Sequence, residues 1–335
     1  MILTLTNFRN FSAKNFNLSA KHILLTGPNA SGKTNILEAL FLLGSGKSFH
    51  AQKEVEMIKF ASDFARVQVK INKDLTLEVI LPRNGYKKLK VNNLGKRLID
   101  YVGNLRVVLF RPQDIELLTG SPSVRRNFLD SILSSVNRDY RKTLISYEKG
   151  LRQRNRLLKR IRDENLKTDQ LLFWNQLLIK NGDYLSQKRE DLITFINETS
   201  QLNNKFLEVK YLKNAISEGR LTKYAQEEIF AAQTLVGPHR DDFEVFQEKE
   251  NVGSFASRGE QRMAILWLKI AELKYIFNLT QEKPLLLLDD IFSELDEDHK
   301  KVVFEVIVSH QTIITSAEKT SGLIENLKGL EIINL

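Results

Sequence analysis

A glycine-rich segment near the amino terminus has the residue types and spacing of a phosphate-binding loop. Its eight residues are Gly27, Pro28, Asn29, Ala30, Ser31, Gly32, Lys33 and Thr34. The glycines let successive backbone N–H groups turn toward the same phosphate oxygens, and a helix that begins here adds the positive end of its dipole. Lys33 would contact the β- and γ-phosphates, and the Thr34 hydroxyl would bind Mg²⁺. The segment therefore predicts a nucleoside triphosphate site, with a glycine turn before an ordinary helix as the alternative.

Two carboxylates follow an apolar run near the other end of the chain. Residues 285–288 are four leucines, and Asp289 and Asp290 come directly after them. A fully apolar run is typical of a central parallel strand, and the carboxyl ends of such strands are where open α/β sheets bind their ligands. Asp289 would hold Mg²⁺ through water, and Asp290 would polarise the attacking water. The alternative is a buried strand that ends in a solvated acidic turn.

A polar segment, Ser-Arg-Gly-Glu-Gln at 257–261, precedes a long amphipathic helix. Ser257 is a candidate N-cap, and the N–H groups of the first helical turn would favour an anion. Taken alone, the segment is more simply the polar start of a helix.

An α/β framework is needed to position these three segments. Short apolar or β-branched runs lie at 23–26, 66–71, 106–110, 285–288 and 312–315 and alternate with segments of helical spacing. Between 123 and 200, apolar residues recur at steps of three and four, and a turn at 165–169 would divide this stretch into two antiparallel helices. We expect one α/β domain built from residues 1–122 and 201–335, with a helical arm or lid inserted at 123–200.

The composition is that of a globular protein without thiol chemistry. Hydrophobic residues make up 42% of the 335 residues, and no apolar run approaches the ~18 residues of a membrane helix. The chain has no cysteine, which excludes disulfides, thiolate metal sites and cysteine catalysis. The amino terminus lacks the layout of a signal peptide, so we expect a soluble cytoplasmic protein. The 50 basic and 41 acidic residues give a formal net charge of +9, which favours an anionic partner such as nucleic acid.

Much of the excess positive charge lies in the expected arm. Between Arg138 and Arg162 there are ten basic residues and two acidic ones. This imbalance lacks the alternating signs of a salt-bridged surface, so it predicts contact with DNA phosphates without base-sequence specificity. A solvated helical face is the alternative. The candidate DNA contacts are Arg152, Arg154, Arg156, Lys159 and Arg160.

The order of the motifs resembles that of ATP-binding-cassette ATPases. Residues 257–261 are similar to the signature of that class, Ser-Glu-Leu-Asp at 293–296 is similar to its D-loop, and Thr315-Ser316 falls where its switch residue lies. Within the class, a set of collinear segments resembles the RecF family. These segments are 7–11, 32–39, 110–114, 120–122, 125–130, 237–242 and 288–290. One departure is at 28–30, where the family usually has an Asn-Gly pair; Ala30 removes backbone freedom there but no ligand group.

The resemblance implies an ABC/SMC-type P-loop ATPase head with a helical lid or arm. In that class the signature, here Ser257, Gly259 and Gln261, caps the γ-phosphate bound by the partner subunit, so two ATP molecules join a head-to-tail homodimer. Gln113 is the implied Q-loop residue, a ligand of ATP and Mg²⁺. Lys33 and Asp290 are the implied catalytic residues. The five histidines are scattered along the sequence. Of these, His239 is expected to be a structural or interface histidine rather than a metal ligand.

The resemblance also implies a function in DNA repair. It implies a weak, DNA-stimulated ATPase whose dimer binds gaps or single-strand/duplex junctions. With RecO and RecR, it would promote loading of RecA onto single strands coated with single-strand-binding protein. One rival is the ATPase subunit of a membrane transporter, against which the basic arm and Asp290 in place of glutamate argue. Another is a DNA-binding scaffold insensitive to nucleotide, against which intact Lys33, Asp289 and Asp290 argue.

Overall fold

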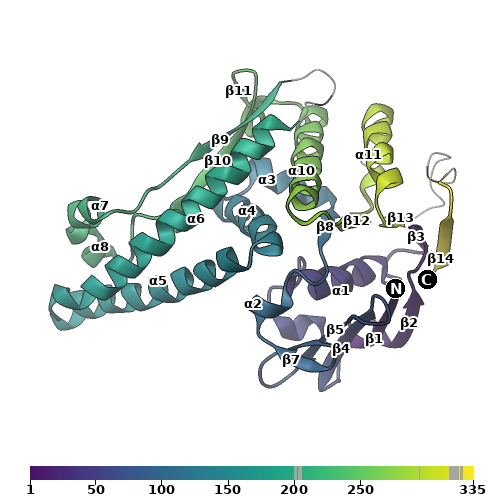
Figure 1. Ribbon diagram of the computed structural model, residues 1–335, viewed down its shortest axis with the longest axis horizontal. Helices are drawn as coiled ribbons and strands as arrows, with labels where there is room; N and C mark the ends of the chain where they lie inside the picture. The colour runs from purple at the N-terminus through teal and green to yellow at the C-terminus, as the bar shows by residue number, and fades with distance from the viewer. Residues whose placement is uncertain (200–201, 203–205, 294, 317–323, 325–326) are drawn as a thin grey trace. The chain divides into compact units, whose positions relative to one another are not determined.

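The computed structural model describes residues 1–199, 202, 206–293, 295–316, 324 and 327–335 (Figure 1). These residues form two compact units. The first joins both ends of the chain, Met1–Asp114 and Glu272–Leu335, and the second is the continuous segment Ile115–Ala271. In the described residues, no helix is long and apolar enough to span a membrane.

Strands predominate in the first unit and helices in the second. The strands are β1 (Ile2–Phe8), β2 (Phe11–Asn17), β3 (His22–Thr26), β4 (Phe64–Lys70), β5 (Thr76–Pro82), β6 (Lys88–Val91), β7 (Leu94–Lys96), β8 (Val107–Phe110), β9 (Leu207–Leu212), β10 (Asp242–Gln247), β11 (Glu250–Asn251), β12 (Leu285–Asp289), β13 (Thr312–Ser316) and β14 (Leu330–Asn334). The α-helices are α1 (Lys33–Ser45), α2 (Leu98–Tyr101), α3 (Glu116–Thr119), α4 (Pro122–Val136), α5 (Arg138–Glu164), α6 (Leu172–Glu198), α7 (Glu218–Lys223), α8 (Ala225–Ala231), α9 (Val252–Phe255), α10 (Arg258–Thr280) and α11 (Glu297–Ser309). The 3-10 helices are η1 (Glu54–Met57), η2 (Pro112–Ile115), η3 (Thr168–Leu171), η4 (Pro238–Arg240) and η5 (Ile291–Ser293).

A parallel sheet in the first unit contains four of the five runs that the sequence predicts as strands, and the fifth, 66–71, lies in the antiparallel sheet. Its order is β14-β3-β13-β12-β8, and every neighbouring pair is parallel. Strands β3, β12 and β13 are buried along their whole length, as expected for strands covered on both faces. The α/β fold is therefore confirmed, and the carboxyl ends of β3, β12 and β13 reach one edge of this sheet.

A second sheet of the first unit is antiparallel, with the order β2-β1-β4-β5-β6-β7. Helix α1 contacts β4 and β5 of this sheet and also β8, β12 and β13 of the parallel sheet. Residues on all sides of α1 are accordingly buried. Gly44 allows the close approach, since a Cβ there would lie 2.7 Å from Cγ2 of Val107. The helix that follows the phosphate loop is therefore held from both faces.

The second unit contains the expected helical arm. Helices α5 and α6 form an antiparallel hairpin (Figure 1), joined through Asn165, which adopts a left-handed conformation with φ 53°. A three-stranded antiparallel sheet, β11-β10-β9, packs on this group through contacts of β9 with α6 and of β10 with α4. Because these strands pack with the helices, the second unit spans 115–271, whereas the expected insertion ended at 200.

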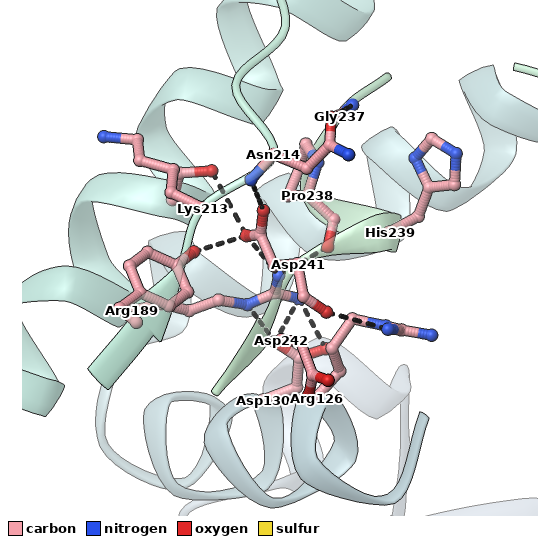
Figure 2. A network of polar contacts seen from close by, with 12 residues as sticks. Arg126, Asp130, Arg189, Lys213, Asn214, Gly237, Pro238, His239, Asp241 and Asp242 are labelled. Carbon is pink, nitrogen blue, oxygen red and sulfur yellow. Dashed lines mark hydrogen bonds and ion pairs between the residues drawn. The ribbon is translucent and has the colours of Figure 1, made fainter. Parts of the chain in front are cut away.

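A buried polar network ties the elements of the second unit together (Figure 2). Arg189 of α6 donates from Nη1 to Asp241 Oδ2 at 2.9 Å and from Nη2 to Asp130 Oδ1 of α4 at 2.8 Å. The Asp241 carboxylate also accepts hydrogen bonds from the Asn214 backbone N–H at 2.7 Å and from the Tyr211 hydroxyl. Both Arg189 and Asp241 are almost fully buried. The segment 237–242, which includes η4, is therefore connected by hydrogen bonds to α4, α6 and β9.

Candidate nucleotide-binding site

The phosphate loop lies between β3 and α1 and depends on backbone conformations that favour glycine. Gly27 has φ +146° and Gly32 has φ +109°. At Gly32 space is also limited, since a Cβ would lie 2.6 Å from the Phe11 ring and 2.8 Å from the Asn10 side chain. Ala30 adopts φ +68°, a conformation that costs an L-residue with a Cβ about 1–2 kcal/mol. Ala30 therefore adopts its loop conformation at an energetic cost.

Two polar side chains of the loop, Lys33 and Ser31, bear on what it can bind. The Lys33 ammonium donates to the carbonyl oxygens of Gly27 at 2.6 Å and Pro28 at 3.0 Å, so it lies against the loop that precedes it. The Ser31 hydroxyl is buried and has no hydrogen-bond partner among the described residues. A buried hydroxyl without a partner is costly. The loop therefore fits an anionic ligand that would complete these hydrogen bonds.

Thr34 and Asp289 meet at the carboxyl edge of the parallel sheet. The Thr34 hydroxyl donates to Asp289 Oδ1 at 2.9 Å, and the Thr315 hydroxyl donates to the same oxygen at 2.9 Å. Strand register explains the second contact, since Asp289 and Thr315 pair directly across β12 and β13. A carboxylate and a hydroxyl are ligands that suit Mg²⁺ beside phosphate groups. The residues present therefore fit a Mg²⁺–nucleotide complex.

Asp290 ends the apolar strand in an unusual conformation. Its φ is +51°, which is uncommon for a residue other than glycine and is often found where function requires it. Its backbone N–H donates to the Thr315 hydroxyl at 3.0 Å. The side chain is exposed, whereas that of the neighbouring Asp289 is buried. The two acids thus face different surroundings, as their different predicted roles require.

The turn between β1 and β2 holds the phosphate loop and α1 in place. Arg9 donates from Nε and Nη2 to the buried carboxylate of Glu38 at 2.7 and 2.6 Å. Asn10 donates to the Ser31 carbonyl oxygen at 3.0 Å and accepts from the Asn35 side chain at 2.9 Å. Sequence reasoning gave these residues no site role. The available signal was the position of an arginine and asparagines inside a turn, with a glutamate on the apolar helix that follows the loop.

Gln113 lies on η2 and is exposed. Arg111, two residues before Gln113, holds this short helix in place. It donates to Asp114 Oδ1 at 3.2 Å and to the Phe49 carbonyl oxygen at 3.0 Å. The role of Gln113 as a ligand of ATP and Mg²⁺ stays a prediction.

The signature segment begins α10 in the second unit, and its predicted N-cap forms. The Ser257 hydroxyl accepts from the Glu260 backbone N–H at 3.4 Å, and the Glu260 carboxylate accepts from the Ser257 N–H at 3.0 Å. This reciprocal pair is a capping box. Gln261 donates from Nε2 to the Val252 carbonyl oxygen at 3.2 Å. At Gly259, a Cβ would meet no atom within 4 Å. The start of the helix is therefore both ordered and open.

The segment expected to be the D-loop lies in the first unit. The Ser293 hydroxyl donates to the Asp290 carbonyl oxygen at 2.8 Å, and Asp296 caps α11 by accepting from the His299 N–H at 2.9 Å. Glu294 lies outside the described residues.

Several known proteins are similar to this chain over nearly its whole length. The chain matches the family model described as RecF/RecN/SMC N terminal domain over residues 2–331. The DNA replication and repair protein RecF of Lachnoclostridium phytofermentans is 37% identical over 327 residues, which cover 93% of this chain and 91% of that protein. This chain belongs to the RecF family. A solved structure described as the recombination mediator protein RecF-ATPrS in the RecFOR pathway is 30% identical, with a TM-score of 0.90 over 100% of this chain and 95% of that one.

The RecF-type head shares its fold with SMC heads. The Smc head domain derived from Pyrococcus furiosus superimposes with a TM-score of 0.53 at 17% identity, covering 99% of this chain and 92% of that one. At this identity the likeness concerns the fold alone, which confirms an ABC/SMC-type head.

His239, in the RecF-type segment 237–242, has partners on both ring nitrogens. Nδ1 is 2.8 Å from the Tyr147 hydroxyl and Nε2 is 3.0 Å from the Thr234 carbonyl oxygen. Burial lowers the pKa of the imidazole to about 4. A neutral ring held in this way acts as part of the packing of the second unit.

One predicted DNA contact requires correction. Arg154 is 2% exposed; it donates to Glu228 Oε2 at 2.7 Å and to Thr234 Oγ1 at 2.8 Å. It lies on the face of α5 that packs against the rest of the second unit, so it cannot contact DNA. Arg160 is exposed but pairs with Glu164 at 3.1 Å. The other three candidates, Arg152, Arg156 and Lys159, are exposed.

Proposed function

We propose that this protein is an ATP-dependent DNA-binding protein of recombinational repair, which uses ATP hydrolysis as a switch. The observation that carries the proposal is the hydrogen bond between Thr34 and Asp289, 255 residues apart in the chain. It joins a phosphate loop to the carboxylate strand of the same sheet, the combination that binds Mg²⁺ and a triphosphate in P-loop ATPases. The descriptions of the relatives, a DNA replication and repair protein and RecF-ATPrS, support DNA and ATP as ligands.

In this proposal each polar group near the loop has one task. The backbone N–H groups of the loop residues other than Pro28, together with Lys33 and the Ser31 hydroxyl, bind the β- and γ-phosphates. Thr34 and Asp289 hold Mg²⁺, with Gln113 as a further ligand; the ion would neutralise charge on the phosphates. Asp290, exposed at the end of the strand, would orient and polarise the attacking water. Hydrolysis changes no other substrate.

The active form in this proposal is a head-to-tail homodimer. Ser257, Gly259 and Gln261 would contact the ATP bound by the partner subunit. The open start of α10 supports this role, because the N–H groups and dipole of a helix N-terminus bind anions. The dimer would bind DNA at gaps or single-strand/duplex junctions without base-sequence specificity. RecO and RecR would be its protein partners, through which RecA would be loaded, and DNA would stimulate a weak ATPase.

Two variants test the shared site. Ser257→Arg should bind ATP as a monomer and fail to dimerise, because a bulky cation replaces the hydroxyl at the start of the helix. Asp290→Asn should bind ATP and accumulate as a dimer, because hydrolysis lacks its polarising carboxylate. Sedimentation velocity with and without ATP measures both outcomes. Ser257→Ala is the matched control, since it removes the cap at a cost of about 1 kcal/mol without adding a charge.

The same proteins separate the rival functions. Cosedimentation with DNA that depends on ATP supports the proposal, whereas cosedimentation that ignores ATP indicates a scaffold. Absence of DNA binding in both conditions would favour a motor of another kind, such as a transporter ATPase. A Ser257→Arg protein that dimerises normally with ATP would refute the shared site and leave a self-contained ATPase.

A further inference from the structure

The α5–α6 hairpin carries a groove that the proposed ATPase does not use. Its volume is about 410 Å³, and its lining includes Ile145, Leu177, Phe173, Trp174, Lys142 and Lys149. Gly150 brings the helices together beneath it, because a Cβ there would lie 2.6 Å from Leu177 Cδ2. The floor is therefore apolar, and the rim contributed by α5 is cationic.

Two aromatic side chains form one wall of the groove. The rings of Phe173 and Trp174 are 5.0 Å apart at an interplanar angle of 80°, an edge-to-face pair. Phe173 is 63% exposed. A large apolar ring left in solvent beside a groove suits a flat ligand that can cover it. Nucleobases are such ligands, since each has an apolar π-face.

A row of cations runs along the same side of α5. Lys142, Lys149 and Arg156 are spaced seven residues apart, and seven residues nearly complete two helical turns. They therefore share a face, at intervals of about 10 Å along the axis. All three are exposed, and within the described parts of the chain none has an ion-pair partner. The row extends past the groove toward the end of the hairpin.

We propose that this groove binds unpaired bases of single-stranded DNA, with the phosphates along Lys142, Lys149 and Arg156. The inference rests on the proposed function and assigns the single-stranded part of its DNA substrate to α5 and α6. A repeating polyanion matches a row of cations longer than the groove, and bases of a duplex are stacked inside and cannot reach Phe173. Charge and stacking together favour a single strand over a compact acidic ligand.

Tryptophan fluorescence gives a direct test, because the chain has two tryptophans. Trp267 is fully buried and Trp174 lines the groove. An oligothymidylate should quench Trp174 emission, and an abasic oligonucleotide of the same length should not. The oligothymidylate should also bind about tenfold more tightly than the abasic strand, from stacking on one or a few bases. Equal binding and no quenching by either strand would overturn the inference.

Variants of two adjacent residues sharpen the test. Phe173→Ala should lose the preference for the oligothymidylate over the abasic strand. Leu172→Ala should keep it, because Leu172 is equally exposed at 62% but does not line the groove. Loss of the preference in both variants, or in neither, would contradict stacking on Phe173.

Other occupants of the groove give different results. Quenching by a polyglutamate peptide in place of the oligothymidylate would assign the groove to an acidic protein. A lower sedimentation coefficient of Phe173→Ala without DNA would assign it to a second copy of the chain. Either result overturns the inference. The proposed function fails separately, when the wild-type protein binds no DNA of any form with or without ATP.

Discussion

Buried polar side chains are paired with one another in the network of the second unit, whereas the candidate nucleotide site contains a buried polar group without a partner among the described residues. In the network, the Asp241 carboxylate accepts hydrogen bonds from four groups of the protein, on Arg189, Ser186, Tyr211 and Asn214. In the phosphate loop, the buried Ser31 hydroxyl has no partner among the described residues, and Lys33 contacts only carbonyl oxygens. A fully paired network rigidifies a core, whereas an unpaired buried group costs free energy until a partner arrives. This contrast distinguishes residues that stabilise the fold from residues that would bind a ligand.

Breaking the network should produce the largest effect on stability. Arg189→Met should lower the free energy of unfolding by about 3–5 kcal/mol, because Asp130 and Asp241 would lose the cation that compensates their burial. Urea unfolding followed by circular dichroism measures this loss. Lys188→Met is the matched control on the same helix, since its ion pair with Asp191 is on the surface; it should cost less than about 1 kcal/mol. Similar losses in both variants would show that the network is not what stabilises the second unit.

Replacing Lys33 should change ATP affinity strongly and stability very little. Lys33→Ala should weaken ATP binding by about 10- to 100-fold, since it removes charge-assisted contacts worth about 1.5–3 kcal/mol. Without ATP, stability should stay within about 0.5 kcal/mol of wild type, because the ammonium contacts only two loop carbonyls. Calorimetric titration with ATP and urea unfolding measure the two effects. Lys47→Ala, an exposed change beyond the end of α1, should alter neither, and wild-type affinity in Lys33→Ala would refute the site.

His239 should make the network sensitive to acid. The unfolded imidazole takes up a proton near its ordinary pKa of 6.5, whereas the folded one does so only near 4. The unfolded state therefore binds more protons between these values, and stability falls as the pH falls through this window. Because of His239, the free energy of unfolding should be about 2 kcal/mol lower at pH 5 than at pH 7. Urea unfolding at both values should show a smaller loss for His239→Asn than for wild type; an equal loss would contradict the assignment.

The smallest expected effect is at Ala30. Ala30→Gly should stabilise the protein by up to about 1 kcal/mol, because relief of the left-handed strain exceeds the entropy that glycine adds to the unfolded chain. Ala231→Gly in α8 is the control of opposite sign and should destabilise by up to about 1 kcal/mol. Thermal unfolding compares the two. Destabilisation by Ala30→Gly would mean that the loop carries no strain at this residue.

The phosphate loop and the strands β3, β8, β12 and β13 of the parallel sheet could be predicted from the sequence because their signals are local. The phosphate loop needs glycines at fixed spacing between a strand and a helix, and four consecutive leucines leave few alternatives to a central strand. The order of both in the chain then places Asp289 at the carboxyl edge of the sheet. The capping box of α10 is equally local, since Ser257 and Glu260 are three residues apart.

Contacts between distant segments could not be predicted in this way. The ion pair of Arg9 with Glu38 joins a turn to a helix that is buried on all sides, and neither residue type implies the other. Arg154 was misassigned because a count of charges along a helix ignores which face is packed. The extent of the second unit depends on β9 and β10, whose packing on α6 and α4 has no signature in their composition.

The strand order of the parallel sheet has a consequence for synthesis of the chain. Strand β3, which leads into the phosphate loop, has β13 and β14 as its neighbours, and both are synthesised long after β3. At about 5–20 residues per second, β3 and α1 wait roughly 15–60 s before β13 is available. The second unit is continuous in sequence and is fully synthesised before β13. Ending translation before β13 would therefore leave a complete second unit joined to an incomplete sheet with exposed strand edges, a species prone to aggregate.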